Sequence, residues 1–273
     1  IPVIGTSEWF ANPENFNFFQ NHLNTALDWE AVASASAEEV ARNPSILARV
    51  SAWDPVRQRE VFRIDSGDGW NAGLLSTAGN LVFQGDGNGE FAAYRANDGT
   101  KLWSAHAGTG IQAAPVTYEV DGEQYVTVLG GWGGSLGSFM GDPGPSPSQE
   151  AIGRVLTYKL GSSESLPPPG VVEYVVPDIA DTTASAEIIE RGKVLYLDQC
   201  SWCHGYDVVG NGSFPDLRYS SAATHSIWNS IVLDGAYVPR GMPAFGDAYT
   251  EDDAQAIRAY VIRQGRLTLG SED

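Results

Sequence analysis

Residues 199–205 read QCSWCHG, and this stretch holds both cysteines of the 273-residue chain and one of its four histidines. Two thiols three residues apart suit three kinds of site. A thioredoxin-like C-x-x-C begins a helix that follows a strand. A structural zinc site normally needs four ligands. The third kind is C-x-x-C-H, which attaches haem covalently.

The surrounding sequence favours the haem site. Apolar side chains recur at helical spacing between 188 and 197, after Ser185 as N-cap, and predict a helix before the cysteines instead of a strand. The chain has no second cysteine pair to complete a zinc site. We therefore predict that Cys200 and Cys203 reach the two vinyl groups of one porphyrin and that His204 lies under the iron.

A haem of the electron-transfer kind needs a second axial ligand, for which methionine is common. Met140 lies in a loop before the motif, whereas Met242 lies in the Gly/Pro-rich stretch VPRGMPAFGD after a predicted helix in SIWNSIVLDGA. Met242 is therefore the predicted ligand. The carbonyl of Pro215 is a candidate acceptor for the ring N–H of His204. His225 is an alternative ligand, although it lies where a helix is expected to start and a polar histidine is unremarkable.

The C-terminal region predicts a small helical domain. The stretch TEDDAQAIRAYVIRQGR indicates an amphipathic helix with Thr250 as N-cap and acidic residues in its first turn. With a helix on each side of the C-x-x-C-H motif and a later methionine, residues 181–273 resemble a class I cytochrome c domain, which is an all-α fold.

Residues 1–160 instead predict strands joined by tight turns. Apolar runs in NLVFQGDGNGEFAAYRANDGTKLW are broken by D-G-N-G and N-D-G, both hairpin signals. The stretches AWDPVRQREVF (52–62) and AYRANDGTKLW (93–103) align, and each begins with alanine and ends on an aromatic residue. A repeat near 40 residues with four short strands per unit indicates a β-propeller.

The repeats resemble the pattern Ala-x-Asp-x-x-Thr-Gly-x-x-x-Trp in the blades of pyrroloquinoline-quinone (PQQ) dehydrogenases. The second copy keeps Ala93, Gly99 and Trp103, and the first keeps Ala52 and Asp54 but departs at the other positions. With the cytochrome region that follows, the chain resembles the C-terminal part of the quinohaemoprotein alcohol dehydrogenases.

The resemblance implies a multidomain fold. Residues 1–160 would form the C-terminal blades of an eight-bladed all-β propeller, residues 161–180 a Pro-rich linker, and residues 181–273 the cytochrome c domain. Residues 10–50 interrupt the strand pattern with aromatic residues and a helix-like Ala/Glu run. We expect this insertion either to shape substrate access or to cap the propeller.

The resemblance also assigns the quinone site. Trp70 and Trp132 stand where the family places groups around PQQ, and Asn71 is a weaker candidate, although blade packing would explain the tryptophans equally well. The family's general-base aspartate and Ca²⁺ ligands lie in the earlier half of its sequence, so we expect no catalytic residue in this chain. Because the chain has room for only about three blades, we expect a second polypeptide to carry the N-terminal half of the propeller.

The implied function is oxidation of a small alcohol at PQQ, with Ca²⁺ polarising the quinone and electrons passing through the haem c iron to a soluble cytochrome or copper protein. Covalent haem and the family both imply a periplasmic location. Two alternatives remain open. One is an electron-transfer subunit whose β part is a docking platform, and the other is a propeller of the nitrite-reductase type with a different cofactor.

The chain is strongly acidic, with 34 acidic and 16 basic residues and a formal net charge of −18. Nucleic acid and anionic membrane surfaces attract basic patches, so we expect neither as a partner. No stretch approaches the roughly 20 apolar residues of a membrane span. The acidic surface either keeps the protein soluble or docks a basic partner.

Overall fold

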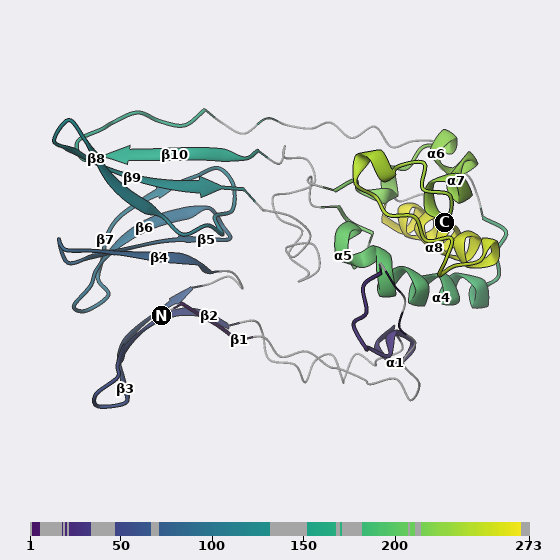
Figure 1. Ribbon diagram of the computed structural model, residues 1–273, viewed down its shortest axis with the longest axis horizontal. Coiled ribbons are helices and arrows are strands. Elements are labelled where there is room, and N and C mark those ends of the chain that lie inside the picture. The colour runs from purple at the N-terminus through teal and green to yellow at the C-terminus, as the bar shows by residue number, and fades with distance from the viewer. Residues whose placement is uncertain are drawn as a thin grey trace. The chain divides into compact units, whose positions relative to one another are not determined.

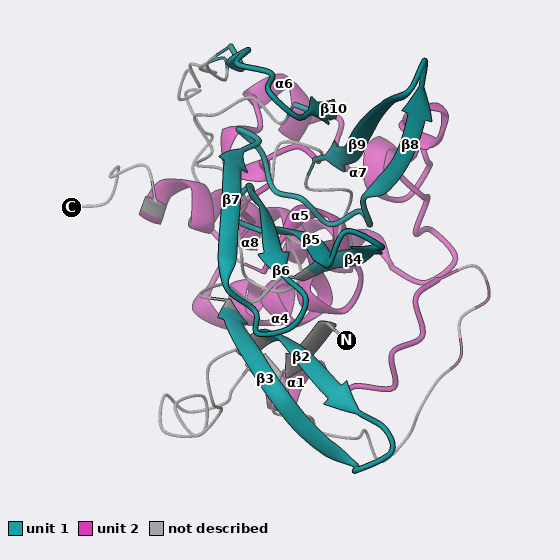
Figure 2. Ribbon diagram, turned by 90° about the vertical axis from the view of Figure 1, so that its left-hand side faces the viewer, with its two compact units in different colours: residues 1–8, 42–133, 144–172 teal, residues 9–41, 134–143, 173–273 magenta. Residues whose placement is uncertain are grey.

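A computed structural model of the chain describes residues 2–5, 18, 20, 22–33, 47–66, 71–131, 152–167, 170, 182–206, 208–210 and 214–268. The chain divides into two compact units (Figure 2). The first contains residues 1–8, 42–133 and 144–172, and the second contains residues 9–41, 134–143 and 173–273. The described part of the first unit consists of strands and turns, and that of the second is helical (Figure 1). The predicted fold class is confirmed.

The described residues of the first unit form three antiparallel sheets. The first sheet contains β1 (Pro2–Gly5), β2 (Leu47–Asp54) and β3 (Arg59–Ser66). The second contains β4 (Asn71–Thr77), β5 (Leu81–Asp86), β6 (Glu90–Arg95) and β7 (Lys101–His106). The third contains β8 (Val116–Val120), β9 (Glu123–Gly130) and β10 (Arg154–Lys159). Strands adjacent in the sequence pair throughout each sheet, as in the blades of a propeller.

The internal repeat is confirmed by strand register. Ala52 pairs with Phe62 across β2 and β3, and Ala93 pairs with Trp103 across β6 and β7. A register shift follows the alanine in both hairpins. The first and last residues of the two repeats therefore occupy equivalent places in consecutive sheets.

Gly99 shows why the repeat ends its turn on glycine. Its φ is +75°, a backbone conformation that residues with a Cβ rarely adopt. A Cβ at this position would also lie 2.8 Å from the ring of Phe62 in the preceding repeat. Glycine thus satisfies the turn and lets one sheet approach the next.

The core of the first unit lies between the second and third sheets. Phe91 and Val128 are fully buried there, on β6 and β9. The ring of Tyr158 on β10 lies 5.3 Å from Phe91 and 5.1 Å from Trp103, so the aromatic end of the second repeat packs on the next sheet. Such pairs add to the burial of apolar area.

Helices and short 3₁₀ or π turns form the second unit. They are α1 (Trp29–Ala33), α4 (Ala186–Leu195), the π turn η1 (Tyr196–Cys200), α5 (Ser201–His204), η2 (Leu217–Tyr219), α6 (Ala222–Ser226), α7 (Trp228–Val232), η3 (Val238–Arg240) and α8 (Glu251–Thr268). The Oγ of Ser185 accepts a hydrogen bond from the N–H of Ile188, and the Oγ1 of Thr250 accepts one from the N–H of Asp253. Both predicted N-caps are confirmed.

The helix expected in SIWNSIVLDGA is shorter than predicted. The chain breaks at Ile227, whose φ of −112° and ψ of 23° separate α6 from α7. After this break the buried indole of Trp228 donates from Nε1 to the carbonyl of Ala254 on α8, at 2.8 Å. A tertiary contact therefore sets the local geometry.

The insertion expected at 10–50 is divided between the two units. Residues 42–50 belong to the first unit, whereas residues 9–41 belong to the helical unit. The described part of the latter stretch contains α1, and Trp29 at its start is buried among residues of α4, η1 and α5. We therefore assign residues 9–41 to the helical unit.

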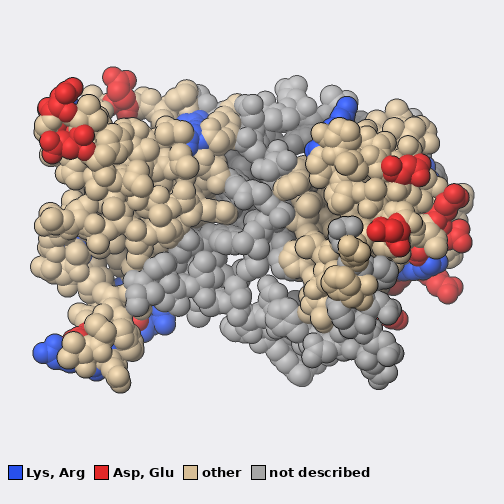
Figure 3. Space-filling view, viewed as in Figure 1, with Lys and Arg blue, Asp and Glu red and all other residues tan. Residues whose placement is uncertain are grey.

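Acidic side chains are prominent on the surface drawn in Figure 3, at the tip of the β8–β9 hairpin and over the helical unit. At the hairpin tip Glu119, Asp121 and Glu123 are all exposed. Within the described ranges, no helix combines the length and the apolar composition needed to cross a membrane.

Candidate cofactor site around the C-x-x-C-H motif

The backbone of the motif is shaped by a π turn that the sequence did not reveal. Helix α4 passes into η1, which ends at Cys200, and α5 then carries Cys203 and His204. The hydroxyl of Ser201 donates to the carbonyl of Leu197 at 2.7 Å. Single π turns inside helices are frequent at functional sites, and this one adds a residue to the turn that presents the first thiol.

The two cysteines are not bonded to each other. Burial raises the pKa of the Cys200 thiol to about 12, and it also raises the pKa of Cys203. A redox-active C-x-x-C pair instead has a thiol whose pKa is lowered. The environment therefore argues against a thioredoxin-like role.

The sequence contains no second cysteine pair that would complete a structural zinc site. Among the residues that the structure describes, no group of three or more His, Cys, Asp or Glu side chains is arranged to hold a metal ion. A structural zinc site normally uses four such ligands. Covalent attachment of haem remains the interpretation that uses both thiols.

His204 is held in the tautomer that a metal ligand needs. Its Nδ1 lies 2.9 Å from the carbonyl oxygen of Pro215, so Nδ1–H donates and the lone pair resides on Nε2. Burial lowers the pKa of His204 and favours the neutral ring. The predicted role of Pro215 as acceptor is confirmed.

The segment that carries this acceptor is fixed by a buried ion pair. Arg218 donates from Nε to Oδ1 of Asp216 at 2.9 Å and from a terminal nitrogen to Oδ2 at 2.6 Å. Gly210 packs closely against the same segment, since a Cβ there would lie 2.5 Å from the backbone nitrogen of Asp216. The segment that carries the Pro215 carbonyl is thus held by its own ion pair and by close packing against Gly210.

Met242 lies in the turn after η3. Its N–H donates to the carbonyl of Tyr237 at 3.3 Å, and Gly241 before it has a φ of +94°. The side chain is partly buried against the core cluster of the helical unit, and Cys200 packs against the same cluster. Met242 and the motif therefore border one apolar core, while ligation by Met242 stays a prediction.

His225 is a core histidine. Its side chain is buried and its ring stacks on Trp228 with the centroids 5.5 Å apart. Burial, together with the nearby positive charge of Arg258, lowers the pKa of His225 to about 4. We expected His225 to be an unremarkable polar residue at a helix start, but it packs inside the helical unit instead.

The chemistry of these residues fits a covalently bound haem. One thiol ends a π turn and the other follows it, a neutral imidazole is oriented by a carbonyl, and a thioether lies at the border of the same core. That core is built mainly from large apolar and aromatic side chains, the surroundings that a porphyrin ring requires. Its buried members are Tyr196, Val208, Trp228, Val232, Phe245, Ala254, Ile257, Tyr260 and Val261.

The structure describes no side chain of the residues predicted to form the quinone site. Trp70 and Trp132 are not among the described residues, and of Asn71 only the backbone is described, at the start of β4 opposite Asp86. Their predicted contacts with PQQ therefore stay predictions.

Two family models match the chain. One, described as "Glucose/ethanol/alcohol dehydrogenase, beta-propeller domain" for PQQ proteins, matches residues 46–126. The other, described as "Cytochrome C oxidase, cbb3-type, subunit III", matches residues 187–261. The two matches reproduce the predicted order of a propeller region followed by a cytochrome region.

Curated relatives and solved structures agree with the family models. The quinohemoprotein alcohol dehydrogenase ADH-IIG of Pseudomonas putida is 43% identical over 79% of this chain and 30% of its own length. The quinohemoprotein alcohol dehydrogenase of Comamonas testosteroni is 34% identical over 85% of this chain and 32% of its own. The solved structure of ADHIIG from Pseudomonas putida HK5 superposes with a TM-score of 0.82 at 35% identity, covering 100% of this chain and 40% of the other. The chain spans about a third of the length of the curated relatives that it matches.

Proposed function

The chain corresponds in sequence and fold to the C-terminal part of the quinohaemoprotein alcohol dehydrogenases, and from this premise we propose that it carries the haem c and part of the PQQ site of an alcohol-oxidising enzyme. The proposed chemistry is oxidation of a small alcohol at PQQ with one-electron transfer through haem c. The observation that carries the proposal is the C-x-x-C-H motif, with its histidine oriented by Pro215, in one chain with PQQ-type propeller repeats.

The haem would be held by four residues. Cys200 and Cys203 would form the two thioether bonds, and His204 and Met242 would be the axial ligands of the iron. In this arrangement the Pro215 carbonyl keeps the proton on Nδ1 of His204, which leaves Nε2 for the metal. The apolar cluster that borders Cys200 and Met242 would exclude water and help to set the reduction potential.

The rest of the enzyme is proposed from the family relation. Trp70, Asn71 and Trp132 would contact PQQ. The Ca²⁺ ligands and the general base would come from the N-terminal propeller region of the enzyme, since this chain spans only 30% of the length of the matched relative ADH-IIG. We further propose a soluble cytochrome or copper protein as electron acceptor and a periplasmic location.

Analysis of the bound cofactors tests this function against its alternatives. The protein, together with its N-terminal propeller region, is purified, its non-covalent cofactor is extracted for an absorption spectrum, and alcohol-dependent dye reduction is assayed beside it. A quinone and alcohol-dependent reduction support the proposal. A preparation with no second cofactor would indicate an electron-transfer subunit, and a second tetrapyrrole would indicate a propeller of the nitrite-reductase type.

Replacing Met242 by alanine tests the proposed axial ligand. We expect the haem to stay covalently attached while its reduction potential falls by on the order of 100 mV, because a methionine ligand raises the potential. Redox titration followed by absorbance measures the change. The matched control is Met140→Ala, which should leave the potential unchanged. A fall in the control and none in Met242→Ala would assign the ligand to Met140 instead.

A further inference from the structure

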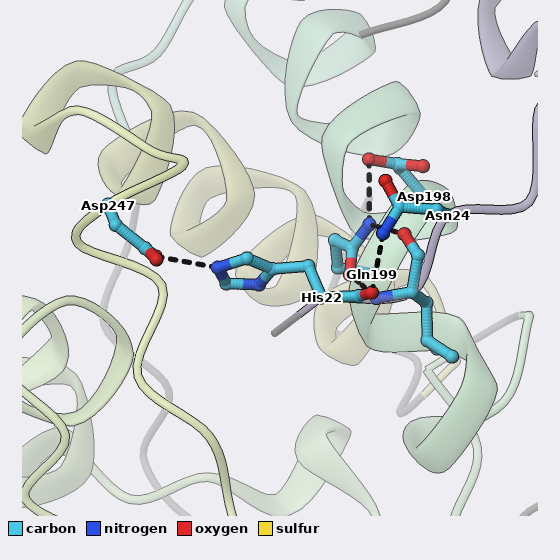
Figure 4. Close-up of polar contacts among 6 residues, drawn as sticks. His22, Asn24, Asp198, Gln199 and Asp247 are labelled. Atoms are coloured by element: carbon cyan, nitrogen blue, oxygen red, sulfur yellow. Dashed lines mark hydrogen bonds and ion pairs between the residues drawn. The ribbon is translucent and has the colours of Figure 1, made fainter. Parts of the chain in front are cut away.

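A short segment of the inserted stretch, residues 22–29, packs on the helical unit that contains it. It lies far in sequence from both the C-x-x-C-H motif and Met242, yet its residues contact the elements that carry them (Figure 4). We call residues 22–29 the brace.

The brace contacts Gln199, the residue directly before the C-x-x-C-H motif. The side-chain amide of Gln199 accepts a hydrogen bond from the N–H of Leu23 at 3.3 Å and donates one to the carbonyl of Leu23 at 2.9 Å. Gln199 is buried, only 8% exposed, and directly precedes Cys200. This pair of bonds joins the backbone of the brace to the turn that presents the first thiol.

The brace also contacts the loop that follows Met242. The Nε2 of His22 lies 2.6 Å from Oδ1 of Asp247, and the imidazole ring lies 5.4 Å from the ring of Phe245. The side chain of His22 is only 3% exposed, whereas that of Asp247 is 64% exposed. The hydrogen bond from His22 is the first cause that lowers the pKa of Asp247. His22, which is adjacent to Leu23, thus binds the loop that follows Met242.

An apolar contact also anchors the C-terminal end of the brace, where α1 begins. Trp29 is buried and meets Trp202 edge to face, with centroids 6.5 Å apart, and lies 6.4 Å from Tyr206. Trp202 is one of the two residues between the cysteines. The packing of Trp29 alone would explain why the brace is attached to the helical unit. It does not explain why the adjacent residues His22 and Leu23 bond in different directions, to Asp247 and to Gln199 (Figure 4).

We propose that His22 and Leu23 bridge Gln199 and Asp247 and so fix the loop of Met242 relative to the C-x-x-C-H segment. His22 is then a positioning residue for the methionine ligand, an inference that rests on the haem ligation proposed above. When the bridge is broken, the loop gains freedom to move away from the iron. The covalent bonds of Cys200 and Cys203 and the ligand His204 do not depend on the bridge.

Competition for the methionine position tests the bridge. In the full protein with its haem oxidised, imidazole is added and its binding to the iron is followed by absorbance. We expect His22→Leu, which removes the hydrogen bond and stays apolar, to bind imidazole about fivefold more tightly than the wild type, the scale of one partly exposed ion pair. Asp247→Ala removes the same hydrogen bond at its exposed partner and should give the same increase in imidazole affinity. This second variant keeps the test valid if His22→Leu, a replacement at a buried position, does not fold.

Two controls separate positioning from a general loss of stability. His22→Gln keeps a donor for Asp247 and should restore the wild-type affinity for imidazole. Lys193→Gln removes an exposed ion pair with Glu190 on α4 and should also leave it unchanged. An unchanged affinity in both His22→Leu and Asp247→Ala would overturn this inference alone. A wild-type protein without covalent haem would overturn the proposed function and this inference with it.

Discussion

A protein in which Cys200 and Cys203 are both replaced by serine is expected to contain no covalently bound haem. A serine hydroxyl does not add to the vinyl groups as a thiol does, so both thioether bonds are lost. The chain has no other cysteine to take over the attachment. The mass of the denatured chain measures the result directly, because covalent haem survives denaturation and non-covalent haem does not.

The single replacements and a ligand variant sharpen this test. Cys200→Ser and Cys203→Ser should each retain at most one thioether bond, and their yield of covalent haem should fall well below that of the wild type. Met242→Ala should retain the full covalent mass, which separates attachment from axial ligation. Haem mass on the denatured Cys200→Ser/Cys203→Ser chain would show that attachment occurs at another residue, and the proposed electron path would be wrong.

The features that the sequence predicted correctly depend on near neighbours or on regular repetition. The caps Ser185 and Thr250 each bond within three residues, so their residue types and spacing sufficed. The pairing of Ala52 with Phe62 and of Ala93 with Trp103 follows from a repeated hairpin. Pro215 was predicted as the partner of His204 because a ligating imidazole generally needs an acceptor behind it.

The features that the sequence did not predict depend on contacts between distant residues. His22 meets Asp247 across 225 residues, and Leu23 meets Gln199 across 176. No periodicity or cap pattern reports such a pair, so the insertion looked like an addition to the propeller. The π turn at Tyr196–Cys200 was equally hidden, since its residues continue the apolar pattern of a helix.

Replacing Gly192 by alanine is expected to destabilise the helical unit by about 2–3 kcal/mol. Gly192 is a buried residue of α4, at its crossing with α8. A Cβ there would lie 2.0 Å from the carbonyl oxygen of Ala256 and 3.1 Å from the backbone nitrogen of Ile257. Because these are backbone atoms of another helix, they have no side-chain rotation with which to give way, and the two helices must separate.

The sign of this effect distinguishes packing from helix propensity. In an exposed helix the same change would stabilise by about 1 kcal/mol, because glycine is the poorer helix former. Urea unfolding followed by circular dichroism measures the difference, with Gly153→Ala as control, since no atom lies within 4 Å of a Cβ there. A Gly192→Ala protein as stable as the wild type would mean that α4 and α8 are not in backbone contact. Because α4 leads directly into the turn that ends at Cys200, a separation of the helices would also displace the first thiol, so we expect Gly192→Ala to bind haem covalently in lower yield as well.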